Sequence, residues 1–356
     1  MKRIAIRVVP ALVLLVAVYA WVAPLVSGQA SGMPSTKNGE WPMYTADLRG
    51  SKYSPLDQIN GTNFSKLEVA WRLKTDNFGP RPETKLEGTP IMVKDSAGTP
   101  RMFATAGTRR AVVALNPATG EIKWTYSLDE GERATRWAPR QLSGRGLSYW
   151  TDGKGDDRVI YVTTGYQLVS LNAKTGQPVA GFGRNGIVDL KQGIMINGKQ
   201  ADLEKSEIGL HSTPTVVNDT ILVGSSMFEG LGYEYATNVQ GQARAFDAKT
   251  GKLLWAFHGI PRRGEFGFDT WKNESAGYTG NNGVWTQITA DPELGIVYLP
   301  VETPTIDEYG GNRPGDNLFA ESLVAVDLKT GVRKWHFQFV HHPLWDHDMS
   351  SAPLLI

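Results

Sequence analysis

Short apolar runs alternate with tight polar turns along this chain, and four segments share one pattern. They read VVALNPATGEIKWTY (112–126), LVSLNAKTGQPVAGF (168–182), ARAFDAKTGKLLWAF (243–257) and LVAVDLKTGVRKWHF (323–337). Each contains a short apolar strand, an Asn or Asp, a Thr-Gly turn and a second strand. The glycine permits the positive φ of a tight turn, and the Asn or Asp side chain can cap it. The capping residues are Asn116, Asn172, Asp247 and Asp327. The pattern predicts four β-hairpins.

The repeat predicts an all-β fold, a β-propeller. Its turn glycines, Gly120, Gly176, Gly251 and Gly331, are 56, 75 and 80 residues apart. Propeller blades run about 40–50 residues, so we expect insertions between strands. Trp124, Trp255 and Trp335 each follow the glycine by four residues, whereas the second copy has Ala180 there and Phe182 shortly after. A tryptophan that recurs once per blade is well placed to pack between neighbouring blades.

Four hairpins are too few for a closed propeller with such long insertions. The last residues, SAPLLI, read as the middle of a strand. We therefore expect this chain to be one part of a longer propeller, or else to be completed by blades from other sequence.

The N-terminus carries an export signal. Three basic residues, Lys2, Arg3 and Arg7, precede an uncharged apolar run, 8–26. Small and polar residues follow the run. This order is typical of a secretory signal peptide, but the run is also long enough to span a bilayer as a retained anchor. Both alternatives export the rest of the protein. We expect residues 1–30 to be the signal or anchor and 31–356 to form the propeller.

Composition narrows the function. The 356 residues include 37 Lys and Arg against 36 Asp and Glu, a net charge of +1. Such a balance gives no indication of a nucleic-acid partner. There is no cysteine, which excludes disulfides, thiolate metal sites and a Cys-x-x-Cys-His haem motif.

Half of the six histidines lie in one stretch, VHHPLWDHDMSSAPLL (340–355), beside two aspartates. A metal site, a catalytic site and a crowded turn are all compatible with it. If the stretch is a strand, Asp346 and Asp348 share one face and His347 lies on the other, so the histidines need not converge on one ion.

The hairpins, the WDHD stretch and the segment WPMYTADLRGSKYSPLDQIN (41–60) together resemble the family of dehydrogenases that depend on pyrroloquinoline quinone (PQQ), the quinoprotein alcohol and glucose dehydrogenases. The resemblance runs from Trp41 to Ile356 and covers about half to two-thirds of a family catalytic domain. It implies an eight-bladed propeller with PQQ and a divalent cation, calcium, on its axis.

The resemblance also implies which residues hold PQQ, a flat o-quinone with three carboxylates. Arg145, in QLSGRGLSYW, would pair with a carboxylate or quinone oxygen. Trp285 would stack beneath the ring system. Glu87, His211 and Ser226 would hydrogen-bond the cofactor, Ser226 and His211 through its carboxylates.

Three positions match the family's metal and base residues. Glu229 and Thr303 would be oxygen ligands of calcium, with Glu302 as the neighbouring alternative to Thr303. Asp346 would lie close to the metal and act as the general base that takes the alcohol proton. The cation would polarise the quinone as a Lewis acid.

The implied function is an exported, periplasmic dehydrogenase that oxidises an alcohol, polyol or aldose sugar and passes electrons to a cytochrome or membrane quinone. The family's adjacent cysteine pair is missing, with Gln141 in that region, and Thr303 matches glucose-type members; both favour sugars or polyols. The alternative is a non-catalytic propeller, an envelope scaffold. The scaffold does not need Arg145, Trp285 and Asp346 in this order. We also expect the chain alone to be inactive and to hold PQQ weakly, because later blades contribute to the family site.

Overall fold

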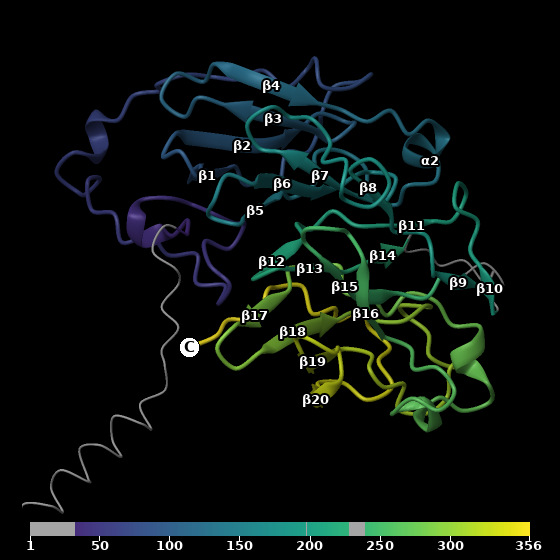
Figure 1. Ribbon diagram of the computed structural model, residues 1–356. Helices are drawn as coiled ribbons and strands as arrows, with labels where there is room; N and C mark the ends of the chain where they lie inside the picture. The colour runs from purple at the N-terminus through teal and green to yellow at the C-terminus, as the bar shows by residue number, and fades with distance from the viewer. Residues whose placement is uncertain (1–32, 197, 228–238) are drawn as a thin grey trace, which may run out of the picture. The chain divides into compact units, whose positions relative to one another are not determined.

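The computed structural model describes residues 33–196, 198–227 and 239–356. The chain divides into two units, Met1–Met33 and Pro34–Ile356, and the second contains the described strands. Four antiparallel four-stranded sheets follow one another in it (Figure 1). The first two comprise β1 (Ile91–Lys94), β2 (Pro100–Ala106), β3 (Ala111–Leu115) and β4 (Ile122–Tyr126), then β5 (Ser148–Thr151), β6 (Asp157–Val162), β7 (Gln167–Asn172) and β8 (Ile187–Asp189). The other two comprise β12 (Thr215–Val217), β13 (Thr220–Val223), β15 (Gln242–Asp247) and β16 (Leu253–His258), then β17 (Thr289–Asp291), β18 (Ile296–Val301), β19 (Ser322–Asp327) and β20 (Arg333–Gln338). The all-β, propeller-type prediction is confirmed.

The remaining elements are short and lie in the insertions. The additional strands are β9 (Met195–Ile196), β10 (Lys199–Gln200), β11 (Ile208–Gly209) and β14 (Ser226–Met227). The helices are η1 (Thr36–Asn38), η2 (Phe64–Lys66), α2 (Glu132–Thr135), η4 (Phe268–Thr270) and η5 (Ser275–Gly277). None of these described helices is long and apolar enough to cross a membrane. The apolar run 8–26 lies outside the described residues.

The repeated turn has the predicted geometry. The four turn glycines have φ of 71–73°, and each preceding Asn or Asp accepts hydrogen bonds from the turn backbone, as Asp247 Oδ1 does from the N–H groups of Lys249 and Thr250. In three sheets this turn joins the third and fourth strands. The second copy is the exception, because Pro178 cannot donate to a ladder and makes only an isolated bridge with Leu171. Its fourth strand begins at Ile187, so the expectation of a strand directly after Gly176 was wrong.

Tryptophans join neighbouring sheets through these turns. The indole of Trp124 donates to the carbonyl of Ala173 at 3.1 Å, and that of Trp255 to the carbonyl of Leu328 at 2.9 Å. Each ring lies on the turn glycine of the next sheet, where an added Cβ would come within 2.6 Å of ring atoms. The packing prediction is therefore confirmed for these two. Trp335 lies on the last described strand, with no following sheet among the described residues, so the packing of this tryptophan stays a prediction.

Each neighbouring pair of sheets shares a hydrophobic core. Val112 and Val159 belong to the core between the first and second sheets, Ile160 and Ile221 to the next, and Trp255 with residues of the fourth sheet to the last. Buried apolar area of this kind is the main stabilising contribution to a fold.

Replacing Gly331 with Ala should lower the free energy of unfolding by about 2–4 kcal/mol, since strain at positive φ costs about 1–3 kcal/mol and the Trp255 contact adds to it. Gly98 is the matched control: its φ is 79°, but an added Cβ there meets nothing within 4 Å. Denaturant unfolding should show a clearly smaller loss for Gly98→Ala. Equal losses would contradict the role of the indole contact.

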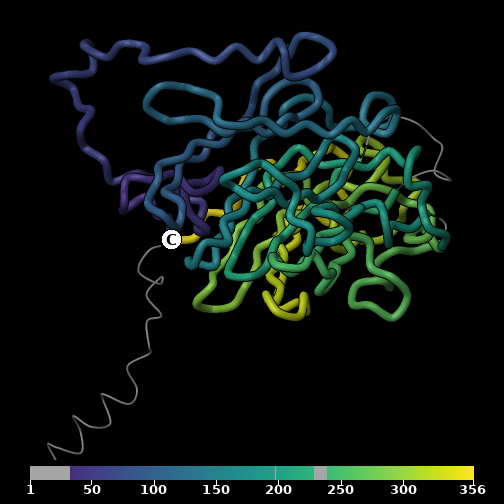
Figure 2. Tube along the Cα trace, turned by 45° about the horizontal axis from the view of Figure 1, so that its top comes forward, coloured from purple at the N-terminus to yellow at the C-terminus, as the bar shows by residue number. Residues whose placement is uncertain are grey.

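The described segment that precedes β1, the purple and blue trace in Figure 2, contains no strand and has only the isolated bridge of Trp41 with Met92. Trp71 nevertheless donates to the carbonyl of Pro117 at 3.0 Å and lies on Gly120, like the tryptophans of the sheets. At the other end of the chain, the N–H of Leu355 donates to the carbonyl of Arg49 at 2.9 Å. The two ends of the described region therefore lie side by side.

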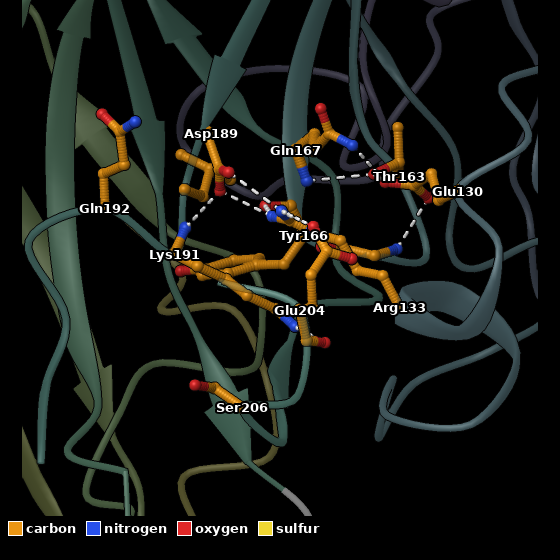
Figure 3. Close-up of polar contacts among 12 residues, drawn as sticks. Glu130, Arg133, Thr163, Tyr166, Gln167, Asp189, Lys191, Gln192, Glu204 and Ser206 are labelled. Atoms are coloured by element: carbon orange, nitrogen blue, oxygen red, sulfur yellow. Dashed lines mark hydrogen bonds and ion pairs between the residues drawn. The ribbon is translucent and has the colours of Figure 1, made fainter. Parts of the chain in front are cut away.

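A buried polar network ties α2 to the second sheet (Figure 3). Arg133 is 4% exposed and donates to both carboxylate oxygens of Asp189, at 2.9 and 2.6 Å. Glu130 accepts from the hydroxyl of Thr163 and the amide of Gln167, each at 2.7 Å. Burial lowers the pKa of the neighbouring Lys191 to about 8. The network thus holds α2 against the second sheet, shortly before the segment 138–145.

Candidate active site

The candidate site is a cavity of about 840 Å³, within the size range of small-molecule and cofactor sites. Three segments supply most of its wall: 81–87, 138–145 and 346–350. Its charged, polar and aromatic lining side chains are Arg81, Thr84, Lys85, Glu87, Arg140, Gln141, Arg145, His211, Trp285, Asp346, His347, Asp348 and Ser350. Four of these side chains are cationic and three are acidic, and Lys85 Nζ lies 3.1 Å from Glu87 Oε1. The remaining excess of arginines is suited to an anionic group of a ligand.

Backbone pairing places Arg145 at the centre of the wall. Its N–H donates to the carbonyl of His211 at 2.7 Å, and its carbonyl accepts from the N–H of Thr89 at 3.0 Å. Gly144 and Gly146 flank it with φ of 65° and 127°, a conformation that suits glycine. A Cβ on Gly144 would come within 2.9 Å of the Arg110 guanidinium, so the glycine also allows a close approach.

Arg110 joins the lining segment 138–145 to the loop that carries His211. It is 1% exposed and donates to the carbonyls of Arg140, Leu142 and Leu210 at 2.9, 3.1 and 2.6 Å. Burial lowers its pKa to about 10, so it stays charged at neutral pH. The sequence analysis missed Arg110, because a lone arginine in a strand-entry turn carries no motif.

Trp285 and His211 form the aromatic part of the cavity. Their rings are stacked, with centroids 5.6 Å apart and an interplanar angle of 16°. The guanidinium carbon of Arg145 lies 5.1 Å from the centroid of the Trp285 ring, an arrangement that favours cation–π attraction. The side chains predicted to stack on and pair with PQQ are thus in contact with one another.

His211 is uncharged at neutral pH. Burial, followed by the charges of Arg145 and Arg140, lowers its pKa to about 3. Its Nδ1 is buried and has no hydrogen-bond partner among the described residues. Buried polar atoms are usually satisfied, so this nitrogen is suited to a bound polar ligand.

The lowered pKa makes a prediction for stability. An unfolded histidine takes up a proton near pH 6.5, whereas folded His211 does so only near pH 3, so stability falls as pH drops through this window. The loss attributable to His211 should be about 2 kcal/mol at pH 5 relative to pH 7. Urea unfolding at both values should show that His211→Asn removes this part of the pH dependence. His341→Asn, on an exposed turn, should leave this pH dependence unchanged. If both variants show the same pH dependence, the loss of stability does not come from His211.

The stretch from Asp346 to Asp348 is a turn and not the expected strand. Asp346 is exposed to the cavity and has φ of 51°, a left-handed conformation incompatible with a strand. Asp346, His347 and Asp348 consequently all line the cavity, so the predicted alternation of faces was wrong.

Asp348 is the anchor of this turn. Its Oδ2 accepts from the indole N–H of Trp285 and its Oδ1 from the backbone N–H of Thr303, both at 2.7 Å. It therefore holds the aromatic floor and the loop after β18 in one arrangement. Sequence reasoning gave it no role, because both partners are more than forty residues away.

The other histidines do not form a metal site. His341 is exposed, with Nδ1 3.9 Å from Asp316 Oδ1, and His342 lies against the carbonyl of Gly315 at 2.9 Å. Within the residues that the structure describes, no group of three His, Asp or Glu side chains is arranged to hold a metal ion.

The predicted site residues divide into three groups. Glu87, Arg145, His211, Trp285 and Asp346 line the cavity together. Two others lie behind its wall: Ser226, 1% exposed, accepts from Arg140 Nε at 3.3 Å, and fully buried Thr303 contacts Asp348. Glu229 lies outside the described residues.

The fold and the cavity define a propeller-type protein with a cationic pocket that has a tryptophan in its wall. These residues fit PQQ: the cations match its carboxylates, Trp285 matches its flat ring system, and Nδ1 of His211 is available for a polar contact. The Arg145 guanidinium and the His211 ring both lie against the Trp285 ring, so a stacked cofactor would require at least one of them to shift.

Residues 41–356 match the family model described as PQQ: Glucose/ethanol/alcohol dehydrogenase, beta-propeller domain. The chain belongs to this family. It is 29% identical over 344 residues to the glycerol dehydrogenase large subunit of Gluconobacter oxydans (strain 621H), covering 94% of this chain and 43% of that protein. It is 31% identical over 329 residues to the dehydrogenase subunit of the quinone alcohol dehydrogenase of the same strain, covering 87% and 39%.

Solved structures agree with the family. A quinohemoprotein alcohol dehydrogenase from Pseudomonas putida HK5 superposes with a TM-score of 0.71 at 26% identity, covering 88% of this chain and 42% of that one. A europium-containing methanol dehydrogenase gives 0.67 at 25% identity, covering 87% and 50%. The chain thus spans less than half the length of the curated relatives it matches.

Proposed function

We propose that the protein containing this chain is a quinoprotein dehydrogenase that oxidises an alcohol, polyol or aldose with PQQ and calcium. The observation that carries the proposal is the convergence of Arg145, His211, Trp285 and Asp346 on one cavity, in a chain of the PQQ dehydrogenase family. A scaffold has no use for a cationic cavity that also contains an exposed carboxylate.

Different residues of this chain would bind the cofactor, accept the substrate proton and hold the site in place. Arg145, with Arg140 and Lys85 nearby, would bind the PQQ carboxylates, and Trp285 would support its ring. When bound, PQQ would supply the quinone that accepts hydride, and the cation would polarise that quinone. Asp346 would accept the proton of the substrate hydroxyl at its carboxylate oxygen. Asp348 would keep Trp285 and the Thr303 loop in place.

We further propose the oxygen ligands of calcium as Glu229 and Thr303, with Asp346 close by. Calcium prefers several oxygen ligands with carboxylate charge. Thr303 is fully buried and lies next to the lining turn 346–348, since its backbone N–H donates to Asp348 Oδ1 at 2.7 Å.

The substrate class is proposed to be a polyol or sugar. The missing cysteine pair and Thr303 favour it, and relatives of this chain include a glycerol dehydrogenase and quinoprotein glucose dehydrogenases. Electrons would pass to a cytochrome or membrane quinone. We also propose export to the periplasm, with the leader either cleaved or retained as an anchor through 8–26; the charge and hydropathy pattern of the N-terminus supports it.

The test is dye reduction by the complete protein that contains this chain, loaded with PQQ and calcium. Glycerol, glucose and ethanol are compared at equal concentration, with and without EDTA during loading. Turnover that requires both PQQ and calcium, and that is higher with glycerol or glucose than with ethanol, supports the proposal. A folded protein that reduces no dye with any of the three would overturn it.

A further inference from the structure

A fully buried acid lies just below the candidate site. Glu321 directly precedes β19 and is 0% exposed. Its Oε1 accepts from the hydroxyl of Thr303 at 2.9 Å and from the backbone N–H of His347 at 3.1 Å. One carboxylate oxygen therefore joins the proposed calcium ligand to the turn that carries the proposed base.

The position of Glu321 recurs in the repeat. It lies six residues before the turn residue Asp327, as Arg110 lies before Asn116 and Tyr166 before Asn172. Glu321, Arg110 and Tyr166 have φ of 42°, 51° and 63°. All three are buried. This left-handed entry to the third strand thus directs a large polar side chain into the neighbouring loops.

The three side chains have different partners. Arg110 donates to backbone carbonyls such as that of Leu142, and Tyr166 donates to the carbonyl of Gly224 at 2.8 Å. Glu321 instead accepts from a side chain, Thr303, and from the cavity turn. Of these three side chains, Glu321 is the one that contacts a proposed calcium ligand and the turn that carries the proposed base.

The direction of the Thr303 bond matters chemically. Because the hydroxyl donates its hydrogen bond to Glu321, the lone pairs of its oxygen remain available to a cation. Carboxylates in such a role orient metal ligands and raise the affinity of the site. The second oxygen of Glu321, Oε2, is buried and accepts no hydrogen bond from the described residues, a cost that the fold retains.

We propose that Glu321 is a positioning residue: it orients the Thr303 hydroxyl toward the cation and fixes the turn that bears Asp346. The inference rests on the proposed function and adds to it a residue that contacts neither substrate nor cofactor. It predicts that the geometry of the acceptor oxygen matters more than the charge of the carboxylate.

The experiment measures calcium affinity by isothermal titration of the complete, PQQ-loaded protein without substrate, followed by kcat and KM at saturating calcium. Glu321→Ala should weaken calcium binding about 10–100-fold and lower kcat with little change in KM. Glu321→Gln keeps an acceptor oxygen at the same place and should restore calcium affinity to within about threefold of the parent. Glu321→Asp keeps the charge but is shorter, and should behave like Glu321→Ala.

Tyr166→Phe is the matched control, because it removes a buried hydrogen bond at the equivalent position of another sheet. It should leave calcium affinity unchanged even where thermal stability falls. The positioning role is wrong if Glu321→Ala folds and binds calcium like the parent, or if Glu321→Asp keeps the calcium affinity and Glu321→Gln loses it. If Glu321→Ala does not fold, the calcium affinities of Glu321→Gln and Glu321→Asp decide between these outcomes. A parent protein that binds PQQ but no calcium would instead overturn the proposed function.

Discussion

Replacing Asp346 with Asn should lower kcat by about 10²–10⁴, the usual contribution of a general base. Asp346 is exposed to the cavity, where it can reach the hydroxyl of a bound substrate. Asparagine has nearly the same shape and tolerates positive φ, so it should keep the backbone conformation of 51°. At saturating calcium, which offsets the loss of a negative charge near the cation, the variant should therefore still bind PQQ and substrate but lack the acceptor of the proton.

The measurement is steady-state dye reduction together with PQQ affinity. Asp316→Asn is the control, since Asp316 is an exposed acid near His341 and does not line the cavity. It should retain the parent kcat. If Asp346→Asn keeps its kcat to within about fivefold, which is below the range for a lost general base, Asp346 is not the base.

Replacing Trp285 with Ala should weaken PQQ binding by about two to three orders of magnitude. Burial of about 100 Å² of aromatic surface contributes about 2.5 kcal/mol, and stacking adds about 0.5–1.5 kcal/mol. The substitution also removes the indole N–H that Asp348 accepts at 2.7 Å. The substitution should therefore weaken PQQ binding and also loosen the turn 346–348.

Equilibrium dialysis against PQQ at saturating calcium measures this loss. Trp285→Phe should recover much of the PQQ affinity, because an aromatic ring remains for stacking. The recovery should be incomplete, because phenylalanine cannot donate to Asp348. Trp335→Ala removes a tryptophan that does not line the cavity and should bind PQQ like the parent once it is folded. Unchanged affinity in Trp285→Ala would mean that the cofactor stacks elsewhere.

Much of the fold could be predicted because its signals are local. Each Thr-Gly turn is specified by residues within five positions, and the structure has the expected positive φ at all four glycines. The second hairpin failed for a local reason as well, since Pro178 interrupts the ladder. There Phe182 and Val188 pack near Gly251 in place of the missing tryptophan.

The site was less predictable because its geometry depends on distant contacts. The turn at Asp346 is held through His347 and Asp348 by Glu321, Thr303 and Trp285. Nothing within the sequence of the turn itself indicates those partners. The family resemblance gave Arg145 and Trp285 their roles, but the residues that support them, such as Arg110 and Glu321, match no motif.

The most direct test of the account is a PQQ titration of the complete protein, followed by tryptophan fluorescence with and without calcium. The account predicts quenching that saturates near one equivalent of PQQ when calcium is present, and that is strongly reduced in Trp285→Ala. Absence of quenching in a folded protein, or quenching that Trp285→Ala leaves unchanged, would show that the cavity between Arg145 and Asp346 is not a PQQ site.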